Sequence, residues 1–246
     1  MKYMGSDDFI NNKERFCLWL LNVSPNELKL LPNTLKRIEK VKYYRESSAR
    51  EATRKLANSP SIFTEIRQPS TNFLIIPSVS SERRKYIPIG YETPKTIINT
   101  DVSFIPNITL YDFGILTSLM HMAWIKTVCG RLESRFRYSN TIVYNNYPWP
   151  ENPTEKQKEQ IEKAAQKVLD ARAEFPNSSL ADLYDPLTMP PILVKAHSEL
   201  DKAVDLAYRP QPFTSDANRM EFLFELYEKY TAGLFAVEKK TRKKTN

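Results

Sequence analysis

Glycine, cysteine and histidine are scarce in this sequence of 246 residues, and each shortage excludes a kind of site. The five glycines, at positions 5, 90, 114, 130 and 233, are too far apart for the glycine-rich strand-to-helix turn that holds a nucleotide-like cofactor. The two cysteines and two histidines share no ligand spacing, which argues against structural zinc and against a disulfide framework. We therefore expect no bound cofactor, no metal and two inert thiols in this chain.

Long apolar runs are also missing. No stretch is long enough to cross a bilayer, and the N-terminus has no apolar signal-peptide core. We therefore expect a cytoplasmic location and no membrane partner. Hydrophobic residues make up 41% of the chain and aromatic residues 11%, enough to build the core of one large domain or two modest ones.

The net charge of +7 is unevenly distributed. Residues 1–150 hold 21 Lys and Arg against 13 Asp and Glu, a balance of +8. Residues 151–238 hold 10 against 16, a balance of −6, and residues 239–246 add five positive charges. The basic first part predicts a polyanionic partner, whereas a basic terminus is more often simply solvated.

A proline-rich segment, residues 147–153, interrupts the chain. Its three prolines cannot continue a helix or a central strand, so a domain boundary or rigid hinge is expected there. We predict a first domain over residues 1–150, a helical domain over 151–238 and a basic flexible tail over 239–246.

The first domain mixes helical and strand patterns. Helices are expected over residues 34–57 and 114–128. Short strands are expected over residues 73–79, 85–89, 102–105 and 141–144, and Pro77 suggests that the first of these is an edge or bulged strand. Elements interleaved without regular spacing predict an α+β fold.

After the boundary the pattern is helical. Amphipathic helices are expected over residues 154–175, 191–208 and 215–234, and Thr154 with Gln157 resembles a capping box at the start of the first. Three such helices predict a small α-helical bundle.

The basic helix over residues 34–57 is the first of four segments suited to nucleic acid. Arg50 and Arg54 are four residues apart, so they repel each other in an isolated helix, and a nearby phosphate backbone would turn that repulsion into attraction. A basic solvent-facing surface balanced by neighbouring glutamates explains the same pattern, and both interpretations remain open.

The second segment lies between two expected strands and would form a hairpin tip. It consists of Ser80, Ser81, Glu82, Arg83, Arg84 and Lys85. Arginine forks match the two acceptors of guanine, carboxylates accept from the cytosine amino group, and hydroxyls bond phosphates. A plain polar turn is the alternative.

The third and fourth segments follow the apolar helix. The third contains Arg131, Arg135, Arg137, Tyr138 and Ser139. Arg135 and Arg137 would project to one side of an extended segment. In the fourth, Asn145 and Asn146 offer amides suited to adenine, beside aromatic residues that can stack on bases. Trp149 is more often an interdomain packing residue, and His121 a core histidine.

Catalytic residues are not expected. Ser118, His121 and Asp112 could be arranged as a triad, but the first two fall in one apolar helix without a nucleophile elbow. Asp201 and Asp205 are spaced as a solvated helix face.

Taken together, the motifs resemble the C-terminal part of the MmeI-like type IIL or IIG restriction–modification enzymes, which fuse an endonuclease to an adenine-N6 DNA methyltransferase. The matching stretches are residues 15–20 (RFCLWL), 80–90 (SSERRKYIPIG), 110–116 (LYDFGIL), 120–124 (MHMAW), 130–139 (GRLESRFRYS), 143–150 (VYNNYPWP), 180–191 (LADLYDPLTMPP) and 222–227 (FLFELY). They follow one order and cover nearly the whole chain.

The resemblance implies that residues up to about 150 form the target-recognition domain and the rest the helical C-terminal region. The family's methyltransferase, with its S-adenosylmethionine site and Asn/Asp-Pro-Pro-Phe/Tyr motif, lies N-terminal to both. Here the one Pro-Pro pair, at residues 190–191, lacks both functional ends, and no nuclease motif is found. The implied partners are double-stranded DNA and that N-terminal domain of the same parent chain.

We therefore expect sequence-specific recognition of double-stranded DNA, with no catalytic activity in this part. A protein-interaction scaffold with a basic face is the alternative. A self-sufficient methyltransferase is disfavoured by the missing motifs.

Overall fold

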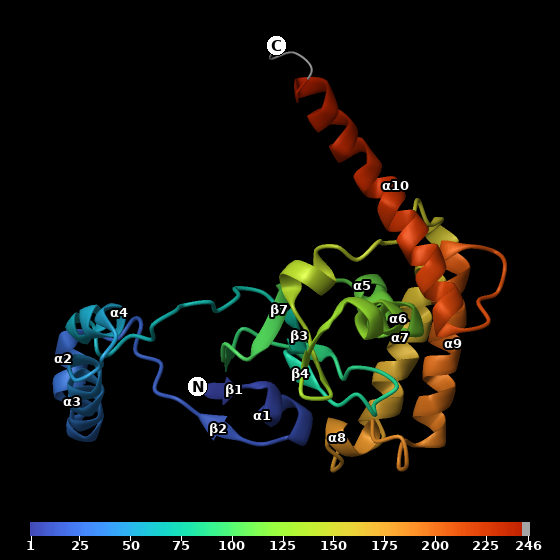
Figure 1. The fold of residues 1–246 in the computed structure, drawn as a ribbon. Helices are drawn as coiled ribbons and strands as arrows, with labels where there is room; N and C mark the ends of the chain where they lie inside the picture. Colours follow the sequence, from blue (N-terminus) through green and yellow to red (C-terminus); the bar gives the residue numbers. More distant parts are fainter. Residues whose placement is uncertain (243–246) are drawn as a thin grey trace.

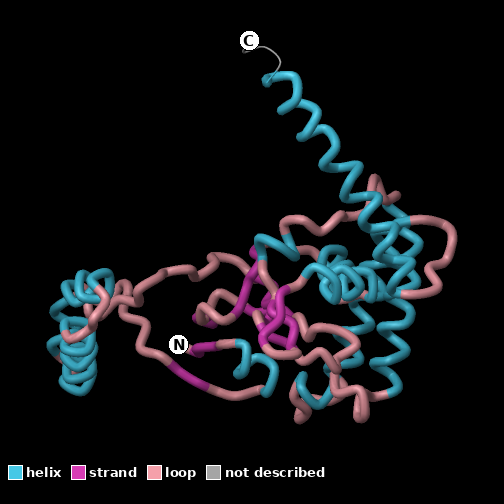
Figure 2. The backbone as a smooth tube through the Cα atoms, in the orientation of Figure 1, coloured by secondary structure: helices cyan, strands magenta, loops and turns pink. Residues whose placement is uncertain are grey.

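The computed structural model describes the backbone of residues 1–242 and the side chains of residues 1–233. Its arrangement is the α+β fold that the sequence predicts, with short strands in the middle of the molecule and helices on both sides (Figures 1 and 2). One small group of helices, α2 to α4, stands apart at one side, and the C-terminal helices form the other side (Figure 1).

Within the described part of the chain, all of the strands lie in the first 150 residues. In chain order the elements are β1 (Lys2–Met4), α1 (Ser6–Asn11), β2 (Arg15–Phe16), α2 (Pro25–Lys29), α3 (Pro32–Glu46), α4 (Glu51–Lys55), the 3-10 turn η1 (Leu56–Asn58), β3 (Phe73–Pro77), β4 (Val79–Ser80), β5 (Gly90–Glu92), β6 (Thr96–Ile98), β7 (Val102–Pro106), α5 (Leu110–Leu116), α6 (Leu119–Val128), β8 (Gly130–Leu132), β9 (Arg135–Arg137) and the π-helical turn η2 (Asn140–Tyr144). The remaining elements are α7 (Glu155–Ala173), α8 (Leu180–Leu183), α9 (Pro191–Tyr208) and α10 (Asp216–Arg242).

The strands form three small sheets, ordered β2-β1-β6, β5-β3-β7 and β4-β9-β8. β3 is the central strand of its sheet, so the expectation of an edge strand at Pro77 was wrong. Pro77 is the last residue of β3, opposite Val102, where its missing N–H interrupts little of the ladder. The strand expected over residues 102–105 is confirmed as β7.

Both helices expected in the first domain are interrupted at serine residues, Ser47 and Ser48 in the first and Ser118 in the second. The helix over 34–57 is interrupted after α3, where the Arg54 guanidinium donates to the carbonyls of Ser48 and Ala49 at 2.9 and 3.0 Å. The helix over 114–128 is split into α5 and α6, because Ser118 leaves the helix and caps α6 by accepting the backbone N–H of His121.

Two expected strands are not formed. Residues 85–89 are irregular backbone between β4 and β5 instead of a strand; Lys85 is exposed and residues 86–89 are buried. Residues 141–144 lie in η2, because the Asn146 amide donates to the carbonyls of Thr141 and Ile142 at 2.7 and 3.0 Å and so favours a turn over an extended chain.

The C-terminal helices agree closely with the sequence pattern. Thr154 and Gln157 form the expected reciprocal capping box at the start of α7. α9 spans the expected residues, and α10 continues beyond residue 234 to Arg242. Of the expected tail over 239–246, residues 239–242 belong to α10 and residues 243–246 lie outside the described part.

One large hydrophobic core joins the two predicted domains. It contains Phe113 of α5, Trp124 of α6, Ile161 of α7 and Leu200 of α9. α7 packs against α9 and α5, whereas α10 packs against α6, so the helices of the first domain complete the expected bundle. This core continues across residue 150. The division of the chain into two domains at that residue therefore stays a prediction.

Candidate nucleic-acid interface

The sheet β4-β9-β8 brings together the two segments that the sequence singles out most strongly. β4 pairs antiparallel with β9, and Val79 lies opposite Arg137 and Ser80 opposite Phe136. Residues 81–85 leave the end of β4, and the β8–β9 hairpin supplies the second segment. Segments about fifty residues apart in the chain therefore share one small sheet.

The β8–β9 hairpin displays its arginines by strand alternation. Glu133 has a φ of 56° and makes the tight turn between the strands. Phe136 is buried, whereas Arg135 and Arg137 on either side of it are exposed. The prediction that these two arginines project to one side is confirmed, and both side chains are exposed.

Arg131 is held differently from the other arginines of the hairpin. It lies opposite Phe136, with its guanidinium carbon 4.2 Å from the centre of that ring. Its two terminal nitrogens donate to the carbonyls of Ser134 and Lys126 at 3.1 and 3.2 Å. Arg131 is thus largely engaged within the hairpin, although its side chain is exposed. Arg135 forms an exposed ion pair with Glu133 at 2.7 Å.

Residues 80–85 divide into exposed and buried members. Glu82, Arg83 and Lys85 are exposed, and Ser81 is half-buried. Ser80 is buried, and no hydrogen bond to its hydroxyl is found among the described residues. Arg84 is half-buried, and burial lowers the pKa of its guanidinium. The exposed side chains are therefore the ones available to a ligand in this conformation.

Beneath this loop, Tyr86 connects the first domain to α9. Its ring stacks on His197 with centroids 3.9 Å apart, and its hydroxyl donates to Asp201 Oδ2 at 2.6 Å. The backbone N–H of Leu119 donates to Asp201 Oδ1 at 2.8 Å. Burial raises the pKa of Asp201 to about 6, although both hydrogen bonds favour its charged form.

Sequence reasoning missed this contact. The spacing of Asp201 and Asp205 indicated a solvated helix face, but Asp201 is buried and Asp205 pairs with the largely buried Arg219 at 2.6 Å. The missed signal is the position of Asp201 among the apolar residues of α9, on the same face as Leu200 and Val204.

A second polar contact fixes the end of the same loop. Arg172 of α7 donates to the carbonyl of Ile89 at 2.6 Å and to the hydroxyl of Tyr184 at 2.7 Å. That hydroxyl lies 2.8 Å from Nε2 of His197. Burial, with a smaller effect of nearby Arg172, lowers the pKa of His197. Residues 86–89 are therefore held by α7 and α9 from below.

The remaining predicted contact residues are placed in different surroundings. Tyr138 is buried, with its hydroxyl 3.3 Å from Nε2 of His121, and is not available to a ligand in this conformation. Ser139 is half-buried, with its hydroxyl 3.0 Å from that of Thr141. Asn145 is exposed, whereas the Asn146 amide donates into η2.

His121 is a core histidine, as the sequence suggests. Its Nδ1 lies 2.7 Å from the carbonyl oxygen of Leu116, and burial lowers its pKa to about 4. Trp149 packs edge-on against Tyr144 and Tyr147, and its carbonyl accepts from Tyr230 of α10 at 2.8 Å, which agrees with a packing role at the hinge.

Arg50 and Arg54 lie far from this sheet, in the group of helices that stands apart (Figure 1). Both are exposed. One terminal nitrogen of Arg54 is engaged with Ser48 and Ala49, which leaves the rest of its guanidinium to solvent. Any contact that these two residues make is therefore separate from the contacts of the hairpin.

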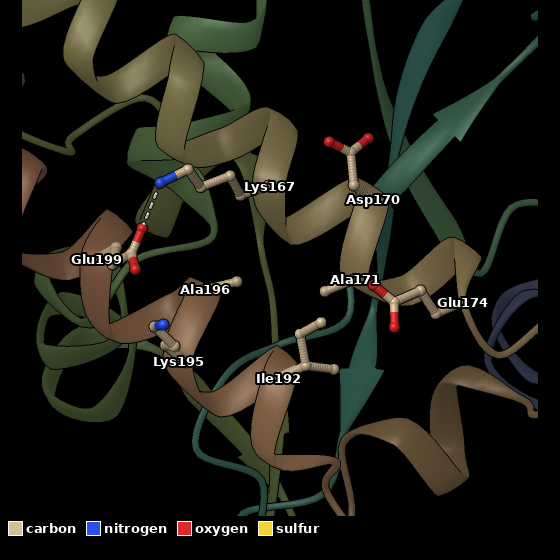
Figure 3. Close-up of a pocket in the computed structure, with 8 residues that line it drawn as sticks. All are labelled: Lys167, Asp170, Ala171, Glu174, Ile192, Lys195, Ala196 and Glu199. Atoms are coloured by element: carbon tan, nitrogen blue, oxygen red, sulfur yellow. Dashed lines mark hydrogen bonds and ion pairs between the residues drawn. The ribbon is translucent and has the colours of Figure 1, made fainter.

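A shallow groove between α7 and α9 offers a different kind of surface. Its hollow of about 320 Å³ is open and lined by charged side chains, with Lys167 reaching across to Glu199 at 2.6 Å (Figure 3). The hydrogen bond from Lys167 lowers the pKa of Glu199. Asp170 and Glu174 point away from that pair, so the groove has the ordinary ion pairs of a solvated helix surface.

Within the described residues, no group of His, Cys, Asp or Glu could hold a metal ion. No helix of that part is long and apolar enough to cross a membrane.

The family model for the MmeI target-recognition domain matches residues 1–151, and the model for the MmeI C-terminal domain matches residues 153–235. The chain belongs to the MmeI family. Among curated proteins, DNA methyltransferase A of Bacillus subtilis (strain 168) is 42% identical over 230 residues, which cover 94% of this chain and 26% of that protein.

Among solved structures, the type IIL restriction–modification enzyme MmeI in complex with DNA matches this chain with a TM-score of 0.90 and 46% identity. The match covers 94% of this chain and 31% of the MmeI chain. This MmeI-family chain therefore spans about a third or less of the length of both relatives.

Proposed function

We propose that this chain is the target-recognition part of a longer adenine-specific DNA methyltransferase of the restriction–modification type, and that it selects a sequence in double-stranded DNA. The family match supports this function, and the related MmeI structure is a complex with DNA. The observation that carries it here is the third sheet, where exposed Arg135 and Arg137 lie beside the loop with Glu82 and Arg83.

The chemistry of these side chains suits the major groove. Each exposed arginine can donate a fork of two hydrogen bonds to O6 and N7 of guanine, and Glu82 can accept from the amino group of cytosine. A two-stranded hairpin is narrow enough to enter that groove. The contacts of residues 86–89 with α7 and α9 anchor the C-terminal end of the loop, which lowers the conformational entropy that the loop would lose on binding.

Methyl transfer is assigned to another part of the parent protein. None of the glycines within the described residues has a positive φ: Gly90 and Gly130 begin strands, and Gly114 lies inside a helix. These residues do not fit the turn that cradles S-adenosylmethionine. We therefore place the cofactor and the catalytic groups in a methyltransferase domain N-terminal to this chain, which would be its partner within one protein.

The test is to map methylated adenines in DNA from cells that express the full-length protein. Arg135→Ala/Arg137→Ala and Arg83→Ala should each lose or alter the site, since one bidentate arginine–guanine contact contributes about 1–3 kcal/mol of discrimination. Lys156→Ala, which removes an exposed cation from α7, should leave the site and its methylation level unchanged.

Two results would contradict the proposal. Unchanged methylation of the same site by the arginine variants would refute the assignment of the hairpin and loop. If the unsubstituted full-length protein bound DNA without any site preference, this result would favour a scaffold with a basic face.

A further inference from the structure

The helices α2, α3 and α4 with η1 form a small lobe that stands apart from the rest of the chain. Extended segments before α2 and after η1 connect it to the central strands (Figures 1 and 2). α3 packs on α2, α4 and η1. The lobe therefore has an inner side, fixed by these contacts, and an outer side of α3 that its own helices leave uncovered.

Arg45 fixes the inner side of α3. Its buried guanidinium donates to the carbonyls of Leu56, Ser59 and Ile62 at 3.0, 2.8 and 2.8 Å. Three charge-assisted hydrogen bonds to one stretch of backbone hold the orientation of α3 about its axis. The residues on its outer face are consequently presented in one defined direction.

The outer face carries two lysines and two tyrosines. Lys36, Lys40, Tyr43 and Tyr44 follow the i, i+4, i+7 and i+8 spacing of one helix face, and we call them the α3 stripe. Tyr43 and Tyr44 are 74% and 73% exposed. Exposed tyrosine hydroxyls beside lysine ammonium groups form a surface that favours a ligand rich in phosphate groups.

The lysines of the stripe differ from Lys42 of α3 and Lys55 of α4, which are ion-paired. Within the described residues, neither Lys36 nor Lys40 forms an ion pair. By contrast, Lys42 lies 3.8 Å from Glu46 and Lys55 lies 2.9 Å from Glu51. Glu46 and Glu51 thus pair with lysines outside the stripe, and Glu39, the carboxylate of α3 beside the stripe, is outnumbered by Lys36 and Lys40, so the stripe keeps an excess of positive charge.

We propose that the α3 stripe binds the sugar–phosphate backbone of duplex DNA that flanks the recognised sequence. Lys36 and Lys40 neutralise phosphates, and the hydroxyl groups of Tyr43 and Tyr44 donate to phosphate oxygens. The lobe stands apart from β4 in Figure 1, so its contacts fall outside the base pairs that the hairpin reads. This inference rests on the proposed function and adds a contact distinct from Arg50 and Arg54.

The test measures binding by the full-length protein to two duplexes that contain the site found by methylation mapping, one without flanking base pairs and one with long flanks. Each affinity is measured over a series of salt concentrations for the parent, Lys36→Ala/Lys40→Ala and the control Lys42→Ala/Lys55→Ala. The substitutions favour helix formation, so the lobe should stay folded, and circular dichroism checks this.

On the flanked duplex, the stripe variant should reduce the slope of log K against log salt by about 1.8, since each lost phosphate contact removes about 0.9. At about 0.2 M salt this corresponds to roughly ten- to twentyfold weaker binding. On the short duplex the stripe variant should bind as the parent does. The control variant removes two ion-paired lysines. It should leave the salt slope nearly unchanged on both the flanked and the short duplex.

An unchanged slope on the flanked duplex would overturn the inference, and so would an equal loss on both duplexes. A lobe that docks on another protein domain would lower activity at an unchanged salt slope, which also overturns it. Failure of the proposed function is seen separately, because the full-length protein would then bind a flanked duplex with a scrambled site as tightly as the flanked duplex that contains the site.

Discussion

The carboxyl group of Asp201 offers the sharpest test of the contact between Tyr86, which follows the loop of residues 80–85, and α9. The perturbation is Asp201→Asn, which removes the charge and keeps the shape. The Asn carbonyl can still accept from the Leu119 N–H, and its amide can donate to the hydroxyl oxygen of Tyr86, whose proton turns away. The variant therefore mimics the protonated form of Asp201 at every pH.

The magnitude follows from the raised pKa. Burial moves the pKa of Asp201 from 3.8 to about 6, a difference of roughly two units, which corresponds to about 3 kcal/mol. A folded pKa above the unfolded one means that the folded state holds its proton more tightly. This stabilisation is complete below pH 3.8 and is lost as pH rises through 6. The two proteins should be similar near pH 4, and Asp201→Asn the more stable at pH 7.

The assay is urea unfolding of this chain between pH 4 and 7, followed by the fluorescence of its buried Trp124. Asp8, whose pKa is lowered by its hydrogen bond with Arg15, loses stabilisation as pH falls, but it does so equally in both proteins. The difference between the two curves therefore isolates Asp201. A difference that stays flat from pH 4 to 7 would refute the reasoning, because an unburied carboxyl group has no such dependence.

Two further substitutions test the packing and the start of α7. Gly114→Ala should lower the free energy of unfolding by about 1–3 kcal/mol, since its Cβ would lie 2.6 Å from Cγ2 of Ile161, whereas Gly130→Ala meets only a carbonyl at 3.9 Å and should be tolerated. A Gly114→Ala chain as stable as the parent by thermal unfolding would contradict this close approach. Thr154→Ala should cost about 1 kcal/mol through loss of the capping box and Thr154→Ser almost nothing, so equal losses in urea unfolding would exclude the cap as the cause.

Features that depend on neighbouring residues could be predicted from the sequence. The cap at Thr154 and the inward residues of α7 follow from spacing alone, because a helix repeats its faces within a few residues. The same holds for Arg135 and Arg137, which flank the buried Phe136 by simple alternation. The pairing of β4 with β9 could not be predicted, since nothing local indicates which distant strand each would join.

Features that depend on distant partners were missed or misjudged. The run at residues 85–89 is apolar after Lys85 and has the composition of a strand, but the partner of Tyr86 is His197 of α9, not a neighbouring strand. Burial by a helix and burial in a sheet leave the same apolar pattern over five residues. Ser80 and Tyr138 are buried by tertiary contacts. Their residue types do not indicate such contacts, so the sequence favoured a surface position for both.

If the chain selects a DNA sequence as proposed, the contact between the loop and the C-terminal helices determines where that preference can change without loss of the fold. Arg83, Arg135 and Arg137 are exposed, so replacing them alters what the surface offers to a base and leaves the interior untouched. Tyr86 lies one layer below, and replacing it removes a buried hydrogen bond to Asp201 as well as the stack on α9. Replacing Tyr86 would therefore disturb both the loop and α9. The C-terminal helices are thus part of the structure that holds the loop in place.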